Sequence, residues 1–527
     1  MKREIGVFEI REKDLAGRIA RLYTPHGVLE TPALLPVIDP VRQEVPLVEI
    51  KRLGFNAVIT NAYLLWKRLG EQAAEKGVHG VLGFEGIVMT DSGAYQLLEY
   101  GHVEVEPREI VEYEKKIGSD IAVILDVPTG NTRDRKQAEE SVRETLRRAE
   151  EAQSYIDPDK RIWTLPIQGG PFIDLVRESA EKARKLKDYK LYALGSPTVL
   201  LERYEYSTLL DMVFTARFSL PVTRPLHLFG AGHPMIIPFA VALGVDMFDS
   251  ASYILYARDN RYMTLTKTYR LENLEYFPCS CPVCSRYTPQ ELREMPRDER
   301  VKLLALHNLY VLRQAINEVK TAIREGRLWE LLEERSRAHP SLATAFAKFR
   351  QYIEKIEQLA PRVKTGFVRG LLLYGSESLY NPRVVAYRRS IRINYKPRIR
   401  GELKLIPVSP FEKPFTSSKL YRSIKKGRRD IHVVGYMLYL GPIPEELAET
   451  YPGSQFEVNL TPYWEVVEET ARSIAEYVEA NKANYTSIEI YYCQGDGLKW
   501  SRPVAEKTTE LLRKRGVEVK LAELGEC

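Results

Sequence analysis

Eight short apolar runs separated by charged segments are the feature that most constrains how residues 1–270 fold. The runs are rich in β-branched residues, and the segments between them have helical periodicity, which is typical of alternating strands and helices around a parallel sheet. Eight such units favour a (β/α)8 barrel, with an open doubly wound sheet as the alternative. The expected strands are Ala33–Val37, Ala57–Asn61, Ile87–Asp91, Ile121–Asp126, Ile162–Gln168, Leu191–Leu194, Leu226–Phe229 and Val245–Asp249. The expected helices include Pro107–Ile117, Lys136–Ala152 and Ile173–Leu186.

Polar residues end several of these strands, at the edge where barrel enzymes place their active sites. They are Asn61, Asp91, Asp126, Gln168 and Asp249. A single aspartate after a strand is often only a helix cap or a turn former. Because several strands end in a polar residue, we expect one site at the carboxyl end of the barrel.

Asp91 and Asp249 suit a double displacement at a sugar carbon. One carboxylate would attack C1′ of a nucleotide while the other exchanges protons with the departing and entering bases. The sequence leaves open whether the two face each other.

Other residues at these strand ends suit recognition of a purine. Asp126 would accept hydrogen bonds from the N1–H and the exocyclic amine of guanine, with a salt bridge to an arginine as the alternative. Gln168 would donate to a carbonyl and accept from an amine. Tyr95 offers a face on which a base stacks, although a core position is the commoner fate of such a tyrosine. In Leu194-Gly195 the glycine permits close backbone approach, so that an amide there would contact a ligand carbonyl.

Three cysteines lie within six residues, in the run Cys279-Ser280-Cys281-Pro282-Val283-Cys284. His307 follows inside an expected helix, Arg300–Glu333. Three sulfurs and one imidazole are the donors of a closed tetrahedral zinc site, so we predict one structural Zn²⁺ per chain. The alternative is three unrelated free thiols.

The composition is that of a soluble globular protein, with 44% hydrophobic and 28% charged residues. The N-terminal segment MKREIGVFEIREKDL lacks the apolar core of a signal peptide, and glycines and prolines interrupt the apolar run 229–245. We therefore expect a cytoplasmic protein without a membrane span.

The net charge of +6 conceals one strongly basic region. Residues 362–429 hold 18 lysines and arginines against three acidic residues, with tyrosines interleaved. This region leans to strand and is expected to bind a polyanion, with a solvated sheet edge as the alternative. We predict three domains: a metal-containing barrel over 1–360, a basic tyrosine-rich α+β domain over 361–430, and an α/β domain over 431–527.

Several motifs in fixed order resemble the tRNA-guanine transglycosylases. They are MTDSGAYQ, VILD, LPIQGG, YALGS, HLFGAGHP, DMFDSASYILYARDNRYMT and CSCPVC, within residues 1–335. The segment SASYILYARDNRYMT is similar to the archaeal branch, whose members insert the precursor of archaeosine. The resemblance implies a zinc-containing (β/α)8 barrel and usually a homodimer.

The resemblance also implies roles for individual residues. Asp249 would be the nucleophile and Asp91 the general acid/base, although the reverse assignment has also been given for the archaeal branch. Cys279, Cys281, Cys284 and His307 would bind zinc. The purine pocket would comprise Ser92, Tyr95, Asp126, Gln168, Leu194 and Gly195.

The implied reaction exchanges guanine at position 15 of the tRNA D-arm for 7-cyano-7-deazaguanine. The target nucleotide must leave its stack, at a cost of about a few kcal/mol, and the basic region is the candidate tRNA contact that offsets this cost. Archaeal members usually end in a PUA-type RNA-binding domain, which is not apparent here. We therefore expect either a separate RNA-binding partner or tRNA binding without that domain.

Two alternatives remain at this stage. An archaeosine-synthase-like paralogue or a tRNA-binding protein without base exchange would share this architecture, but such paralogues lack the aspartate present here as Asp91. Ser409 stands where the synthase has a cysteine. A retaining glycoside hydrolase would use two carboxyl groups about 5 to 5.5 Å apart, but it leaves the cysteine cluster and the basic region unexplained.

Overall fold

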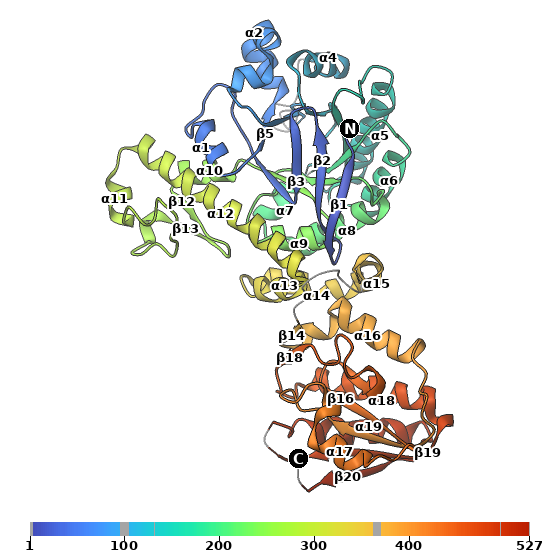
Figure 1. Ribbon diagram of the computed structural model, residues 1–527. Coiled ribbons are helices and arrows are strands. Elements are labelled where there is room, and N and C mark those ends of the chain that lie inside the picture. The colour runs from blue at the N-terminus through green and yellow to red at the C-terminus, as the bar shows by residue number, and fades with distance from the viewer. Residues whose placement is uncertain are drawn as a thin grey trace. The chain divides into compact units, whose positions relative to one another are not determined.

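The computed structural model describes residues 4–94, 105–130, 132–195, 197–361, 370–495 and 497–525. The chain divides between Tyr352 and Ile353 into two compact units (Figure 1). In the described ranges, no helix is both long enough and apolar enough to cross a membrane.

The first unit is built around eight parallel strands in the order β4-β11-β10-β9-β8-β7-β6-β5. A parallel bridge between Val37 and Ile59 joins the first and last strands of that order. The sheet therefore closes on itself, which confirms the barrel and excludes the open sheet. The strands are β4 (Ala33–Pro36), β5 (Ala57–Asn61), β6 (Ile87–Asp91), β7 (Ile121–Val123), β8 (Ile162–Ile167), β9 (Leu191–Leu194), β10 (Leu226–Leu228) and β11 (Met247–Ser250).

A small antiparallel sheet, which the sequence analysis did not predict, covers the N-terminal end of the barrel. It consists of β1 (Phe8–Asp14), β2 (Gly17–Thr24) and β3 (Gly27–Thr31). Leu22 and Leu29 of this sheet belong to one buried cluster with residues that begin the barrel strands: Ala33, Ala57, Ile87, Ile121, Ile162, Leu191 and Met247. Since this end is closed, the C-terminal ends of the strands are left for a site.

Local sequence signals position the helices around the barrel. The side chain of Asn61 accepts a hydrogen bond from the Leu64 amide and caps α2, and Asp134 caps α5 in the same way. Helix α4 begins at Pro107 and ends at Ile117, and Gly118 caps it in a left-handed conformation. The helices are α2 (Ala62–Leu82), α4 (Pro107–Ile117), α5 (Arg135–Ala152), α6 (Ile173–Ala183), α7 (Thr198–Glu202), α8 (Tyr206–Ser219), α9 (Ile237–Ala242) and α10 (Ser252–Arg258).

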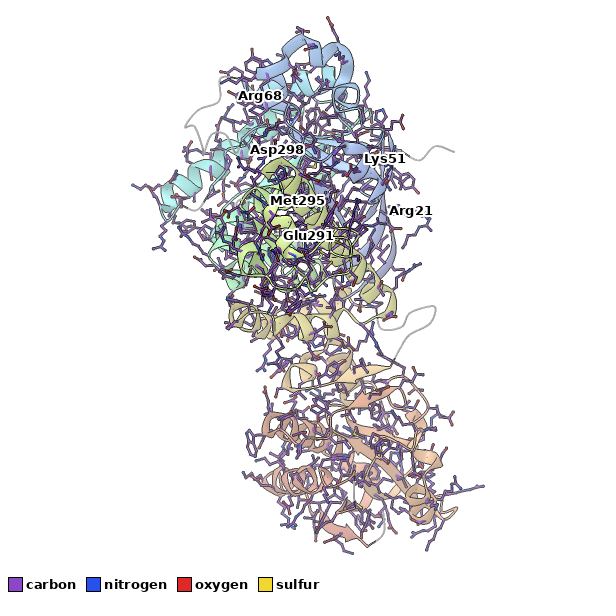
Figure 2. The ribbon with its side chains drawn as sticks, turned by 90° about the vertical axis from the view of Figure 1, so that its left-hand side faces the viewer. Arg21, Lys51, Arg68, Glu291, Met295 and Asp298 are labelled. Carbon is purple, nitrogen blue, oxygen red and sulfur yellow. The ribbon has the colours of Figure 1, made fainter. Side chains whose placement is uncertain are left out.

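After the last barrel strand the chain forms an excursion that carries the cysteines. Figure 1 groups its elements β12 (Arg261–Met263), β13 (Thr268–Arg270) and α11 (Pro289–Glu294) beside the start of α12 (Arg297–Glu325). In Figure 2 this part of the chain faces the viewer, and Glu291 and Met295 are labelled on it. Asn308 of α12 ties the excursion to the barrel, because its side chain accepts from the Met263 amide and donates to the Tyr253 carbonyl.

The single helix predicted over Arg300–Glu333 is wrong at its C-terminal end. Gly326 adopts φ 70° and caps α12 in the left-handed conformation, so a second helix, α13, begins at Leu328. The remaining helices of this region are α13 (Leu328–Ser336), α14 (Pro340–Ala347) and α15 (Phe349–Leu359).

The second unit contains a five-stranded sheet in the order β17-β16-β15-β19-β20 and a two-stranded parallel pair, β14 and β18. The strands are β14 (Leu371–Leu373), β15 (Gly401–Pro407), β16 (Ile431–Met437), β17 (Gly441–Pro444), β18 (Phe456–Val458), β19 (Tyr485–Cys493) and β20 (Lys520–Leu524). Its helices are α16 (Pro382–Ile393), α17 (Lys419–Lys425), α18 (Trp464–Asn481) and α19 (Ser501–Lys514).

The expectation that the basic region leans to strand is wrong over residues 382–393. Asn381 caps α16 by accepting from the Arg383 amide, and Pro382 occupies the first helical position. These two start signals outweigh the β-branched content of the segment.

Candidate active site and metal centre

A cavity of about 1000 Å³ opens at the C-terminal end of the barrel. Three aspartates, Asp91, Asp126 and Asp249, line it together with Asn61 and Gln168. The structure therefore brings together the five polar strand ends that the sequence analysis singled out.

Asp249 near the end of β11 is held by two donors. Its Oδ1 atom lies 2.7 Å from His227 Nε2 and accepts a second hydrogen bond, 2.9 Å long, from the Gly230 amide. His227 is fully buried, and its Nδ1 atom has no hydrogen-bond partner among the described residues. A ring that carries a proton on Nε2 satisfies this arrangement, so His227 donates to Asp249. The two donors fix the position of the carboxylate.

Asp91 at the end of β6 has a different environment. Desolvation, together with the negative charges of Asp126 and Asp249, raises its pKa to about 7. The amide nitrogen of Asn61, its register partner on β5, lies 3.5 Å from its Oδ2 atom. A carboxyl group with this pKa is divided between its two protonation states near neutral pH, as acid/base catalysis requires.

Asp126 is oriented by its neighbours rather than by a salt bridge to its carboxylate. Gln168 Nε2 donates to its Oδ2 atom at 2.6 Å, and Gln168 Oε1 accepts from the Thr129 amide at 3.0 Å. Arg148 pairs with Glu144 and reaches Asp126 only at its backbone carbonyl, with no hydrogen bond to its carboxylate among the described residues. Burial raises the pKa of Asp126 to about 6. The carboxylate is thus an acceptor in the cavity wall, and Gln168 positions it.

Of the other residues predicted for the purine pocket, only Gly195 lines the cavity among those that the structure describes. Gly195 lines the cavity, but its amide donates to the Ile167 carbonyl at 3.0 Å, so this amide is not free to bind a ligand carbonyl. A side chain at Gly195 would meet Gln168 at 2.6 Å, and the glycine therefore provides space for the Gln168 amide. Leu194 and Ser92 are fully buried. Tyr95 lies outside the described residues.

Cationic and aromatic side chains from α10 and from the start of the excursion line the same cavity. The Arg261 guanidinium lies 3.9 Å from the centre of the Tyr256 ring, and Lys267 Nζ lies 5.3 Å from that of Tyr269. The sequence predicts neither these pairs nor the role of His227, because a histidine within an apolar strand is most often a core residue. The short glycine-rich turn directly after that strand is the only local sequence feature that indicates a role for His227 in the site.

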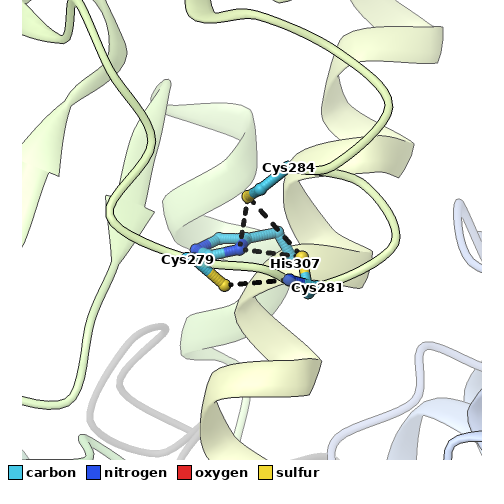
Figure 3. A group of neighbouring side chains, drawn as sticks. All are labelled: Cys279, Cys281, Cys284 and His307. Carbon is cyan, nitrogen blue, oxygen red and sulfur yellow. Dashed lines mark hydrogen bonds between the residues drawn. The ribbon is translucent and has the colours of Figure 1, made fainter.

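Cys279, Cys281, Cys284 and His307 form the metal centre candidate (Figure 3). Cys281 Sγ lies 3.6 Å from Cys284 Sγ, and His307 Nδ1 lies 3.4 and 3.3 Å from these two sulfurs. Ligands at zinc–sulfur and zinc–nitrogen distances on a tetrahedron are separated by roughly 3.5 to 3.8 Å, so the donors are close to a metal-binding arrangement.

The surroundings of His307 support this fit. Its Nε2 atom lies 2.8 Å from the Met263 carbonyl oxygen, to which it donates, so Nδ1 presents its lone pair to the sulfurs. Tyr262 stacks on the imidazole with a centroid separation of 3.8 Å, and its hydroxyl lies 3.2 Å from Cys284 Sγ. The cluster is able to hold a metal ion.

A family model described as Queuine tRNA-ribosyltransferase matches residues 14–341. This range includes the cavity aspartates and all four residues of the metal centre. The chain belongs to this tRNA-ribosyltransferase family. A second model, a domain of unknown function (DUF5591), matches residues 384–511 of the second unit.

Relatives within the tRNA-ribosyltransferase family match almost the whole chain. The tRNA-guanine(15) transglycosylase of Aeropyrum pernix is 53% identical over 92% of this chain and 94% of its own length. Proteins with the same name from Sulfolobus acidocaldarius and Saccharolobus solfataricus are each 44% identical over 93% of this chain, covering 96% and 98% of their own lengths. The family assignment therefore extends to both units.

Proposed function

We propose that this tRNA-ribosyltransferase exchanges guanine at position 15 of the tRNA D-arm for 7-cyano-7-deazaguanine, a step toward archaeosine. The observation that carries the proposal is the contrast between Asp249, held by two donors, and Asp91, whose pKa is raised to about 7, in one cavity. The names of the Aeropyrum and Sulfolobus relatives support the choice of guanine 15.

The proposed reaction is a double displacement with a covalent intermediate. A carboxylate oxygen of Asp249 attacks C1′, the bond from C1′ to the base breaks, and Asp91 gives its proton to the departing guanine. The incoming base then returns a proton to Asp91 while its ring nitrogen attacks C1′ and displaces Asp249. Asp126, oriented by Gln168, would accept from the amine edge that guanine and its 7-deaza analogue share.

We propose that the metal centre holds one structural zinc ion. Three thiolates and one imidazole match the preference of Zn²⁺, and four protein ligands leave no position open for substrate. When bound, the ion would join residues 279–284 to helix α12 and stabilise the excursion that also carries Arg261.

The second unit is the proposed contact for the tRNA backbone. Five of its exposed cations make no ion pair among the described residues: Lys396, Arg398, Arg400, Lys426 and Arg429. The first three precede β15 and the other two precede its parallel neighbour β16, so all five lie near the N-terminal ends of these two strands. A cationic cluster of this kind would contact phosphates.

Most tyrosines of the basic region serve packing within the second unit. The hydroxyl groups of Tyr380, Tyr387, Tyr395 and Tyr421 bond to protein acceptors, and their rings pack against the core. Tyr374, half of whose surface is exposed, is the better candidate for stacking on a base.

Incubation with unmodified tRNA and labelled 7-cyano-7-deazaguanine tests the exchange. We expect label in the tRNA, and none in a tRNA whose guanine 15 is replaced by adenine. Incorporation of labelled guanine but not of the 7-deaza base would limit the activity to guanine exchange. Binding of tRNA without any incorporation would favour the paralogue or a tRNA-binding protein.

The covalent step has its own test. Denaturing electrophoresis of the enzyme with tRNA and no free base should reveal an enzyme–RNA adduct that is absent from Asp249→Asn. An adduct that persists in Asp249→Asn but is lost in Asp91→Asn would reverse the two roles.

A further inference from the structure

Two histidines and an aspartate meet at the base of the barrel, at the end opposite the cavity. His26 lies in the turn between β2 and β3, His79 lies near the end of α2, and Asp120 directly precedes β7. No local motif joins these segments, and the proposed reaction uses none of the three residues.

Two ring nitrogens converge on the two oxygens of one carboxylate. His26 Nδ1 lies 2.7 Å from Asp120 Oδ1, and His79 Nε2 lies 3.0 Å from Asp120 Oδ2. The imidazole rings lie side by side, with centroids 4.0 Å apart. One nitrogen or oxygen atom from each of the three residues lies within 4.8 Å of the others.

Backbone amides hold the Asp120 carboxylate in an orientation suited to a metal ligand. It is fully buried, and the amides of His26 and Val88 each donate to one of its oxygens, at 3.0 and 2.8 Å. Four hydrogen bonds therefore reach this carboxylate, and the two from backbone amides fix its orientation.

The cluster also has a fourth oxygen atom nearby and is open to solvent through His26. The Gly86 carbonyl oxygen lies 3.1 Å from His79 Nε2. Gly77 interrupts the helical conformation of α2 two residues before His79. The side chain of His26 is 54% exposed, so solutes reach the cluster from solvent.

We propose that His26, His79 and Asp120 form a second metal site, for a divalent first-row transition metal such as Ni²⁺, Co²⁺ or Zn²⁺, with the Gly86 carbonyl as fourth donor. Imidazole and carboxylate are ligands that these ions accept. Ligands about 2.0 to 2.2 Å from one ion are separated from each other by roughly 3.0 to 3.5 Å, close to the nitrogen–oxygen distances here.

The site differs chemically from the Cys3His centre, which has three sulfur donors. A bound ion would join the N-terminal sheet to α2 and to the start of β7, three segments far apart in the sequence. It would stabilise the closed end of the barrel. Because the site lies at the end opposite the cavity, metal binding can be measured independently of base exchange.

The test uses the untagged full-length chain with its Cys3His centre saturated with Zn²⁺. Titration with Ni²⁺, followed by calorimetry and by metal analysis after gel filtration, should give one Ni²⁺ in addition to one Zn²⁺ per chain. His26→Gln retains a donor for Asp120 but removes a ligand, and His79→Gln does the same at the other oxygen. Each should weaken Ni²⁺ binding by at least the roughly 10- to 100-fold that loss of a hydrogen-bond partner of a ligand costs, because a ligand itself is removed.

His339→Asn is the matched control, because it removes a histidine elsewhere and retains a good helix cap. Ni²⁺ binding equal to that of the unsubstituted chain is expected for this variant. Cu²⁺ electron paramagnetic resonance should further show two coupled nitrogens, reduced to one in His26→Gln. Absence of a second bound ion, or Ni²⁺ binding unchanged in both glutamine variants, would overturn the proposal. The three residues would then serve only to join their segments by hydrogen bonds.

Discussion

His227 Nε2 donates to Asp249 Oδ1 over 2.7 Å, from a ring with no exposed surface. A hydrogen bond to a charged group contributes about 1.5 to 3 kcal/mol, which corresponds to roughly 10- to 150-fold in rate if it is lost only at the reacting carboxylate. His227→Phe fills the same space without a donor and should lower kcat by about that factor. Steady-state kinetics should show little change in KM for tRNA.

His227→Gln is the companion variant, because its amide retains a donor. It should recover part of the lost kcat, whereas a merely structural role for His227 would give equal losses or parallel changes in kcat and KM. An unchanged kcat in His227→Phe would show that the Gly230 amide alone suffices to hold Asp249.

The pKa values of Asp91 and Asp126 predict a narrow pH optimum. Asp126, with a pKa of about 6, must be ionised to accept from guanine, and Asp91, with a pKa of about 7, must be protonated to give its proton to the leaving base. The kcat/KM for tRNA should therefore be bell-shaped, with limbs near pH 6 and pH 7.

The upper limb of this pH profile can be assigned by substitution. The negative charge of Asp126 raises the pKa of Asp91, so Asp126→Asn should move the upper limb of the residual activity to lower pH. An upper limb that stays in place would mean that another group supplies the proton.

The residues that the sequence could predict are those whose signals are local. Buried strands read as apolar runs, so Asp91 and Asp249 could be predicted at or near strand ends. The strand expected over Ile121–Asp126 is too long, because β7 ends at Val123 and Asp126 lies three residues after it. The cysteine spacing likewise lies within six residues. By contrast, β1 has the sequence FEIREKD, in which only Phe8 and Ile10 are apolar and the last four residues are all charged, so its pattern does not predict a strand.

Other features depend on contacts between distant segments. His227 is a core histidine by its sequence and becomes a partner of Asp249 only when β10 and β11 pair. His26, His79 and Asp120 come from three segments that have no spacing in common. The end of α12 depended on the left-handed conformation of Gly326, which a helical pattern on both sides concealed.

Removal of the proposed zinc should destabilise the excursion before the barrel. Cys284→Ser removes a ligand, and the stabilisation lost is about 2.7 kcal/mol where free zinc stands at 100 times its Kd. In Cys284→Ser, amide hydrogen exchange should become faster in residues 276–295 and at the start of α12, while the amides of strands β5 to β8 stay protected. Ser285→Ala is the control within the same excursion, since Ser285 donates to the Ser280 carbonyl and contributes no metal ligand. Equal exchange in the two variants would argue against a metal.

Glu114 offers a test of stability against pH. It is fully buried in α4 behind Asp91, where its Oε1 atom accepts from Thr90 at 2.6 Å and its Oε2 atom has no partner among the described residues. Desolvation raises its pKa well above the ordinary value. The folded state therefore favours the protonated carboxyl group, whereas the unfolded chain ionises above a pH of about 4.3.

The sign of the pH effect follows from this difference. With a raised folded-state pKa, stability is complete below the unfolded pKa and falls as pH rises, by about 1.4 kcal/mol per unit, until the folded pKa is reached. Glu114→Gln cannot ionise, so its stability relative to the unsubstituted chain should increase between pH 4 and pH 8, as measured by guanidinium unfolding of the barrel. Glu112→Gln, on the exposed side of the same helix, should give a nearly constant difference. A Glu114→Gln difference that does not change with pH would show that Glu114 is ionised in the folded protein.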